Sequence, residues 1–201
     1  MQACSSSATG GRFGLGRCAA CSTRPVVCRS GSGTTATTIK LQAVKLTPET
    51  FAPFGQVIGA TDDMKAFDSE DAQLELSRGT PRFYIMRLPR RGLTFSRITY
   101  HQQCTQCLGG LNPPGRWFMA VAAPSGSVAA YPKQSDLTVF EVPHGTFIKM
   151  HMGTWHAGPL FHEADNMDFY NLELSDTNQV DHNTHDYMQA SSTQFEVLPA
   201  T

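Results

Sequence analysis

Short strand-like runs, set apart by Pro, Gly, Asn and Asp, recur along the chain after residue 55, and in several of them apolar and polar residues alternate. Such alternation is typical of half-buried β-strands, because successive side chains of a strand point to opposite faces. The region shows no sustained helical period and no internal repeat, so it predicts an all-β domain, either a sandwich or a barrel. The predicted strands cover residues 56–58, 82–88, 93–100, 116–122, 137–142, 146–150 and 167–174, with a further one at 195–198.

One short helix is predicted ahead of these strands. Thr47 is suited to cap its N-terminus, Pro48 to occupy its first position, and Glu49 to interact favourably with its dipole. Gly55 is expected to end it. The segment 62–78 lacks a clear period and is predicted to be a long loop.

The N-terminal segment has a different composition. Residues 1–48 contain no Asp or Glu, carry arginines at 12, 17, 24 and 29, and are rich in Ser, Thr, Ala and Gly. This composition predicts an organellar transit peptide over residues 1–38, directed to the chloroplast or else the mitochondrion. A plain disordered N-terminus is the alternative. We expect one domain over 39–176 and a polar tail over 177–201 that crosses the surface before the last strand.

The composition favours a soluble protein that handles a small molecule. Hydrophobic residues make up 40% of the chain and charged residues 16%, and the formal net charge is −1 with both signs interspersed. This balance lacks the basic surface that nucleic acids or anionic membranes attract. No apolar run reaches the roughly 20 residues that a membrane helix needs. A small-molecule substrate is therefore expected, and neither nucleic acid nor membrane as a partner.

The Cys-x-x-Cys pair of Cys104 and Cys107 has two readings. We expect two buried or half-buried thiols, with a redox dithiol as the alternative. A zinc site shared with Cys18 and Cys21 is rejected, because that half falls within the predicted transit peptide and structural zinc takes its ligand pairs from nearby turns.

Candidate chemistry begins in the predicted strand 146–150. Alternation places Phe147, Lys149 and His151 on one face and Ile148 and Met150 on the other. An aromatic, a cation and an imidazole on one face fit the lumen of a ligand-binding barrel better than solvent or a plain core. This face is therefore predicted to line the pocket.

Further imidazoles and an acid lie at matching positions. His156 follows a Gly-containing turn after His151, His101 ends a predicted strand, and Glu173 shares a strand face with an aromatic residue. Inward polar groups in a small barrel are costly unless they are paired or functional. These four residues are candidates for a metal-binding or acid–base site, although each taken alone is as well explained as a satisfied core or rim residue.

Cations near strand ends are candidates for binding an anion. Arg87 and Lys149 are predicted to receive a carboxylate, with rim charges as the alternative. His182 and His185 also lie close together, but within the polar tail, so they are assigned to a solvated loop rather than to a metal site.

Several of these segments together resemble one family. They are residues 46–58, residues 82–87, the motif His151-x-Gly153-x-Trp155-His156-x-x-Pro159-Leu160, and Asp168-Phe169. They resemble the ureidoglycolate lyase family, also called ureidoglycolate hydrolase, over about residues 44–176. The family's bacterial members carry Glu and His in the segment that reads Cys104-Thr105-Gln106-Cys107 here, and this chain is more similar to the plant and algal branch.

The resemblance implies a cupin-like β-barrel of the double-stranded β-helix type that acts as a homodimer. It implies cleavage of ureidoglycolate to glyoxylate and urea in allantoin catabolism. His151, His156 and Glu173 are the implied catalytic residues, and Arg87, Lys149 and Trp155 are expected to bind substrate. His101, His151 and His156 are the implied ligands if a divalent metal is used, with nickel, zinc or manganese as candidates, or no metal at all.

Two other functions remain open at this point. One is a non-catalytic cupin-type binding protein for a small carboxylate or a sugar, favoured by Cys104 and Gln106 standing where the family has titratable groups. The other is a different metal-dependent cupin enzyme acting on another small acid.

Overall fold

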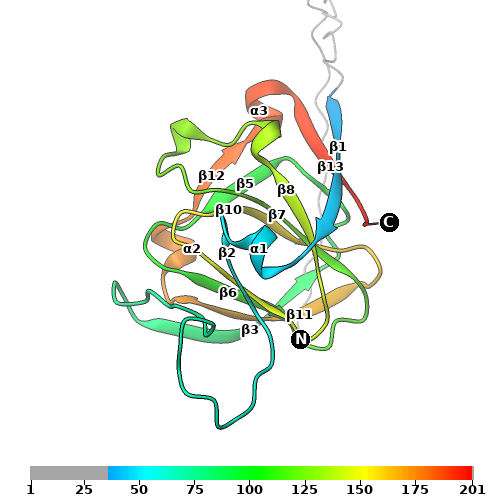
Figure 1. Ribbon diagram of the computed structural model, residues 1–201. Helices are drawn as coiled ribbons and strands as arrows, with labels where there is room; N and C mark the ends of the chain where they lie inside the picture. Colours follow the sequence, from blue (N-terminus) through cyan, green and yellow to red (C-terminus); the bar gives the residue numbers. More distant parts are fainter. Residues whose placement is uncertain (1–35, 201) are drawn as a thin grey trace, which may run out of the picture. The chain divides into compact units, whose positions relative to one another are not determined.

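The computed structural model describes residues 36–200 and folds them into two curled β-sheets that face each other (Figure 1). The larger sheet has the strand order β12 (Asn183–Asp186), β5 (Arg97–Tyr100), β10 (Trp155–Leu160), β7 (Trp117–Ala122), β8 (Thr138–Val142), β1 (Thr37–Lys45), β13 (Thr193–Leu198) and β4 (Thr94–Phe95). The smaller sheet has the order β2 (Gly55–Ile58), β9 (Phe147–Met150), β6 (Gln106–Gly110), β11 (Asn166–Leu174) and β3 (Pro81–Pro89). The predicted all-β, cupin-like fold is confirmed.

The helix α1 (Pro48–Phe51) begins as expected. Thr47 caps it, and its hydroxyl accepts the backbone N–H of Thr50 at 3.2 Å. The prediction that Gly55 ends this helix is wrong, because the helix stops at Phe51 and Gly55 opens β2. A Cβ at Gly55 would lie 1.9 Å from the carbonyl oxygen of Lys149, so glycine is required there for the close pairing of β2 with β9.

Seven predicted strands are present, one of them broken in two. The segment 93–100 divides at Ser96 into β4 and β5, which belong to opposite edges of the larger sheet. Segment 62–78 is a loop, as predicted, and 195–198 falls within β13. Strands β6 and β10 were not predicted, because their Gly-Gly and Gly-Pro pairs are usual signs of turns. In β10 these residues instead form an irregularity, where the pairing with β7 shifts register between Ala157 and Leu160.

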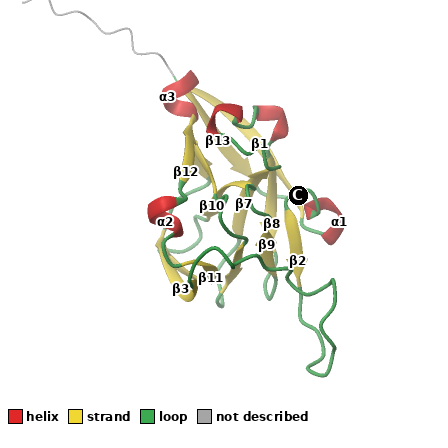
Figure 2. Ribbon diagram, turned by 90° about the vertical axis from the view of Figure 1, so that its left-hand side faces the viewer, coloured by secondary structure: helices red, strands yellow, loops and turns green. Residues whose placement is uncertain are grey.

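The C-terminal segment is part of the fold rather than a surface tail. It contains α2 (Thr177–Val180), β12, α3 (Tyr187–Ser191) and β13. Strand β12 pairs with β5, and β13 runs parallel to β1, which begins at Thr37 within the stretch assigned to the transit peptide. The remainder of that predicted peptide lies outside the described residues. Figure 2 shows α2 at the edge where the chain passes from β11 to β12.

The space between the sheets determines which strand faces can line a pocket. Ile148 and Met150 are buried there in a core cluster with Phe140 and Trp117. Phe147 lies on the opposite face of β9, where its ring stacks on Tyr170. The alternation predicted for residues 146–151 is therefore correct, but the face assigned to the pocket is wrong. None of the helices in residues 36–200 is long and apolar enough to cross a membrane.

Candidate functional site

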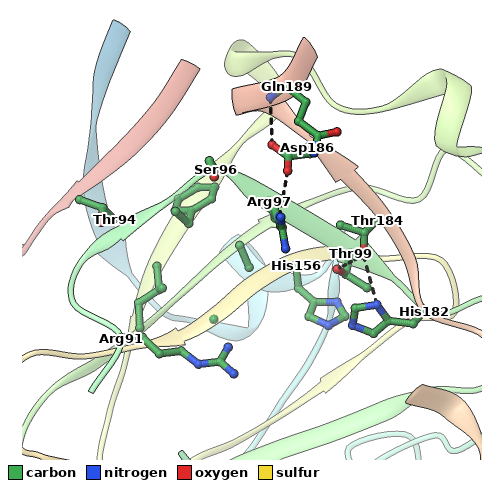
Figure 3. A pocket seen from close by; sticks show the side chains of 14 residues that line it. Arg91, Thr94, Ser96, Arg97, Thr99, His156, His182, Thr184, Asp186 and Gln189 are labelled. Carbon is green, nitrogen blue, oxygen red and sulfur yellow. Dashed lines mark hydrogen bonds and ion pairs between the residues drawn. The ribbon is translucent and has the colours of Figure 1, made fainter. Parts of the chain in front are cut away.

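A polar pocket lies between the two sheets, near α2. Its volume is about 140 Å³. It shares four lining residues with an open groove of about 750 Å³ along β5, β10 and β12, which Figure 3 shows. The pocket is lined by Tyr84, Met86, Leu88, Arg91, His101, Gln106, Leu108, His156, Gly158, Pro159, Asn171, Glu173, Asn178 and His182. Three of the predicted site residues, His101, His156 and Glu173, are thus brought together.

Two of the pocket imidazoles present an unprotonated nitrogen. The ring centroids of His101 and His156 lie 5.1 Å apart. Nδ1 of His101 is 2.6 Å from the carbonyl oxygen of Asp181, and Nδ1 of His156 is 3.1 Å from that of Thr154. A carbonyl oxygen only accepts hydrogen bonds, so each Nδ1 carries the proton. In the neutral rings, Nε2 is left with a free lone pair and can accept a proton.

Burial keeps both rings neutral. It lowers the pKa of His101 below its usual value. It lowers the pKa of His156 to about 3, with a further contribution from neighbouring His101. Burial has this direction because removing water disfavours the charged imidazolium. An anionic ligand beside these rings would favour the imidazolium and raise both pKa values again.

This burial predicts a pH dependence of stability. The unfolded chain protonates His156 near pH 6.5, whereas the folded protein does so only near pH 3. The contribution of this residue is fully present above pH 6.5, and the free energy of unfolding falls as the pH drops from 6.5 toward 3. Chemical denaturation at stepped pH values measures this slope. In a His156→Leu variant, the fall should be shallower, and equal slopes in both proteins would contradict the prediction.

Glu173 is a buried carboxylate surrounded by donors. Its Oε2 accepts from Nε2 of Gln106 at 2.9 Å, and its Oε1 accepts from the hydroxyl of Tyr84 at 3.3 Å and from Nδ2 of Asn178 at 3.1 Å. The residue is 1% exposed. Three donors on two oxygens indicate that this carboxylate orients its neighbours.

The C-terminal segment supplies residues that the sequence did not reveal. The carboxylate of Asp181 accepts the backbone N–H groups of Gln102 at 2.9 Å and Gln103 at 2.6 Å. Its carbonyl also holds His101, so one residue ties this segment to the pocket wall. His182 lines both the pocket and the groove, and its ring centroid lies 5.9 Å from that of His101. The solvated loop expected for these two residues is confirmed for His182, which is exposed and precedes β12. It is wrong for His185, which lies in β12 and stacks on Tyr131.

Arg91 is a second residue that sequence reasoning missed. It lines both the pocket and the groove, and its guanidinium extends toward the side where His156 and His182 lie (Figure 3). Within residues 36–200, four other arginines form ion pairs with carboxylates and Arg91 forms none. It remains available to a bound anion. No periodic signal separates it from its neighbour Arg90 in the sequence.

Comparison with known families identifies the chain's relatives. Residues 38–196 match the family model described as ureidoglycolate lyase. The chain belongs to the ureidoglycolate lyase family. Membership supports a lyase, with ureidoglycolate lyase as its function. Comparison with individual curated proteins gave no significant match.

Three residues expected to bind the lyase substrate lie outside the pocket. Arg87 is on the outer face of β3, where its guanidinium pairs with both carboxylate oxygens of Asp168 at 2.8 Å. Lys149 shares the outer face of β9 with Phe147, opposite Cys107 in the pairing of β9 with β6. Trp155 is fully buried in a core cluster, and its indole N–H donates to Ser125 at 2.8 Å. The structure therefore places these three residues outside the candidate pocket. For Arg87 and Lys149 the reason is that strand alternation leaves open which of the two faces is the inner one.

His151 is also displaced from the pocket of the lyase. Its Nδ1 is 3.2 Å from Nζ of Lys149, and its Nε2 is 3.3 Å from the carbonyl oxygen of Ala52. Together with His101 and His156 it borders only a small gap that has no room for a water molecule. Of the two family-motif histidines, His156 is the one that lines the pocket.

The metal expected from family resemblance does not fit the observed side chains. Among residues 36–200, no group of three or more His, Cys, Asp or Glu side chains is placed to hold a metal ion. His101, His151 and His156 do not converge as a ligand set, and we derive no chemical step through a metal. Measuring the metal content of the purified lyase tests whether it holds the nickel, zinc or manganese that the family resemblance implies.

The two cysteines of the lyase domain are buried free thiols, as predicted. Burial raises the pKa of Cys107 to about 11. The thiolate is the reactive form of cysteine. A redox role is therefore not favoured by their surroundings.

Proposed function

We propose that this lyase cleaves ureidoglycolate in the pocket between the sheets, with His156 as the residue that moves the proton. The observation that carries the proposal is the pair of neutral imidazoles, His101 and His156, beside the unpaired Arg91. An imidazole with a free Nε2 is suited to take a proton from a hydroxyl group.

The substrate's chemistry matches these groups. Its hydroxyl oxygen and the nitrogen of its ureido group are bonded to the same carbon, and a carboxylate is attached there too. Arg91 would hold the carboxylate through two parallel hydrogen bonds. Nε2 of His156 would take the hydroxyl proton, the carbon–nitrogen bond would break as the carbonyl of glyoxylate forms, and the departing nitrogen would take the proton back from His156. One imidazole can carry out both proton transfers, because the hydroxyl oxygen and the departing nitrogen are bonded to the same carbon.

The bound substrate also changes the pKa of His156. A carboxylate beside His156, and the negative charge that develops on the substrate oxygen, both favour the imidazolium. The pKa of His156 in the complex is then higher than in the free enzyme, closer to the working pH that makes a general base effective. His101, with its own free Nε2, can hold the hydroxyl oriented toward His156.

The matched arginines Arg91 and Arg87 test the location of the site. We expect Arg91→Met to raise the KM for ureidoglycolate about 10- to 100-fold, because a charge-assisted hydrogen-bond pair to the carboxylate is lost. Arg87→Met should leave KM unchanged, because that guanidinium lies outside the pocket in an exposed ion pair. Initial rates of glyoxylate release by the full-length protein measure both. A larger KM effect at Arg87 than at Arg91 would contradict the placement.

A homodimer and organellar targeting complete the proposal. The outer face of the smaller sheet exposes Phe83 by 64% and Ile85 by 45%, next to Tyr170, an apolar strip suited to a second copy. Sedimentation velocity tests it: the wild-type lyase should sediment as a dimer and Ile85→Lys as a monomer.

Residues 1–38 are proposed to direct the chain to the chloroplast, which a fluorescent fusion of this segment would test.

A further inference from the structure

Two side-chain amides in the pocket have carbonyl oxygens without a hydrogen-bond partner. They are Oε1 of Gln106 and Oδ1 of Asn171. Gln106 is 8% exposed and Asn171 1%, so neither amide oxygen reaches bulk solvent. Both residues line the same pocket as His156 and Arg91. Buried polar atoms are usually paired in folded proteins, so two unpaired acceptors in one pocket call for an explanation.

Glu173 determines which way these amides point. A carboxylate only accepts hydrogen bonds, so Gln106 must turn its NH₂ group toward Glu173, at 2.9 Å. The Tyr84 hydroxyl donates to Glu173 and therefore accepts from Nδ2 of Asn171 at 3.0 Å. Both NH₂ groups therefore point toward the acid, and both carbonyl oxygens, which belong to residues that line the pocket, are left without a donor.

A ligand that brings N–H donors would complement these two acceptors. A ligand without them would leave both acceptors unpaired, which is unfavourable. A ureido group is planar and carries N–H donors on both of its nitrogens, whereas a carboxylate carries none. Arg91 offers the complementary feature, a guanidinium for an anion.

We propose that Gln106 and Asn171 accept the N–H groups of the ureido end of the substrate and so determine its specificity and orientation. This inference rests on the proposed function for the reaction itself. Glu173 is a positioning residue that acts through Gln106, Tyr84 and Asn171. The carboxylate end of the ligand lies toward Arg91, and the bond to be broken lies between the two ends, within reach of His156.

A pair of unreactive ligands tests this assignment in the full-length protein. Ureidoacetate lacks the substrate hydroxyl, so it is not cleaved, but it keeps the carboxylate and the whole ureido group. N-acetylglycine has a methyl group in place of the terminal NH₂. N-acetylglycine keeps one N–H but lacks the two terminal ones. Calorimetry should give at least about tenfold tighter binding of ureidoacetate, because a site built to accept hydrogen bonds discriminates against a ligand that has lost those donors.

Three variants distinguish the loss of an amide oxygen as an acceptor from a general disturbance of the hydrogen bonds around Glu173. Gln106→Leu and Asn171→Leu should each bring the affinity ratio of the two ligands toward one while N-acetylglycine still binds, which also shows that the variant is folded. Asn178→Leu is the matched control: it removes a donor to Glu173 as Gln106→Leu does, but no unpaired buried oxygen. In Asn178→Leu, the affinity ratio of ureidoacetate to N-acetylglycine should stay near that of the wild type.

The outcomes separate this inference from the proposed function. An affinity ratio of one in the wild-type protein overturns the role of the two amides, even if glyoxylate is released from ureidoglycolate. A ratio of tenfold or more that disappears in Gln106→Leu and Asn171→Leu supports that role, even if no glyoxylate is released, a result that would overturn only the proposed reaction. An equal loss of the ratio in Asn178→Leu also overturns the assignment to the two oxygens.

Discussion

The His156→Gln variant is expected to cleave ureidoglycolate with a kcat about 10²- to 10⁴-fold below that of the wild type. Glutamine has a similar polar reach but cannot accept a proton at Nε2. The wild-type ring is neutral because burial lowers its pKa to about 3, and its Nδ1 proton is committed to the carbonyl of Thr154. Initial rates of glyoxylate release at saturating substrate measure the effect.

Two other histidines provide the controls for this experiment. His144 lies away from the pocket, where its Nε2 meets the carbonyl oxygen of Pro113 at 2.9 Å, so His144→Gln should retain wild-type kcat. His151→Gln addresses the family motif, because His151 precedes His156 in it but does not line the pocket. We expect His151→Gln to lose much less activity than His156→Gln. Equal losses would contradict the assignment of the base to His156.

Replacing Glu173 by Gln is expected to lower both stability and activity. The substitution keeps the size of the side chain but replaces one of its two oxygens by an NH₂ group. That group faces either Gln106 or the pair Tyr84 and Asn178, which all donate in the wild type. One unsatisfied buried donor costs about 1–3 kcal/mol of unfolding free energy. The Gln106 and Asn171 amides also lose the acid that fixes their orientation. Misplaced binding groups of this kind cost about 100-fold in kcat/KM.

Urea denaturation at pH 7 and steady-state kinetics on the same preparation measure both effects. Glu163→Gln is the matched control, because Glu163 is a surface carboxylate that pairs with Arg116 and lies outside the pocket. It should leave kcat/KM unchanged and alter stability little, as is usual for surface ion pairs. Wild-type stability in Glu173→Gln would show that the donors around the carboxylate are not an ordered network.

The β-strands could be predicted from the sequence where no turn residue lies inside them. Strands β3, β7 and β11 lie within a residue of their predicted ends, because apolar side chains on one face must be buried wherever the strand is placed. Prediction failed where turn residues occur inside a strand. Gly158 has a φ of +136° and lines the pocket, and the backbone around it accommodates the irregularity that interrupts β10.

The candidate site was predicted in part, for a related reason. His101, His156 and Glu173 were selected as polar residues at strand positions that a core does not favour, and the structure places all three in one pocket. Arg87 and Lys149 satisfied the same criterion but lie on the opposite strand faces, Arg87 in an exposed ion pair with Asp168 and Lys149 buried opposite Cys107. Their local sequences resemble those of the inward residues, so no pattern within a single strand separates the two groups.

The sequence by itself determined that this chain forms strands, which residues of each strand share a face, and to which family it belongs, because these properties depend on local periodicity and on a short motif. Only the tertiary structure decided which face is the inner one, since that depends on the strands of the opposite sheet. It also decided that Arg91, Gln106, Asn171 and His182 meet His156 in one pocket. Those contacts join residues far apart along the chain, and their energies arise from burial and hydrogen bonds that exist only after the two sheets have packed.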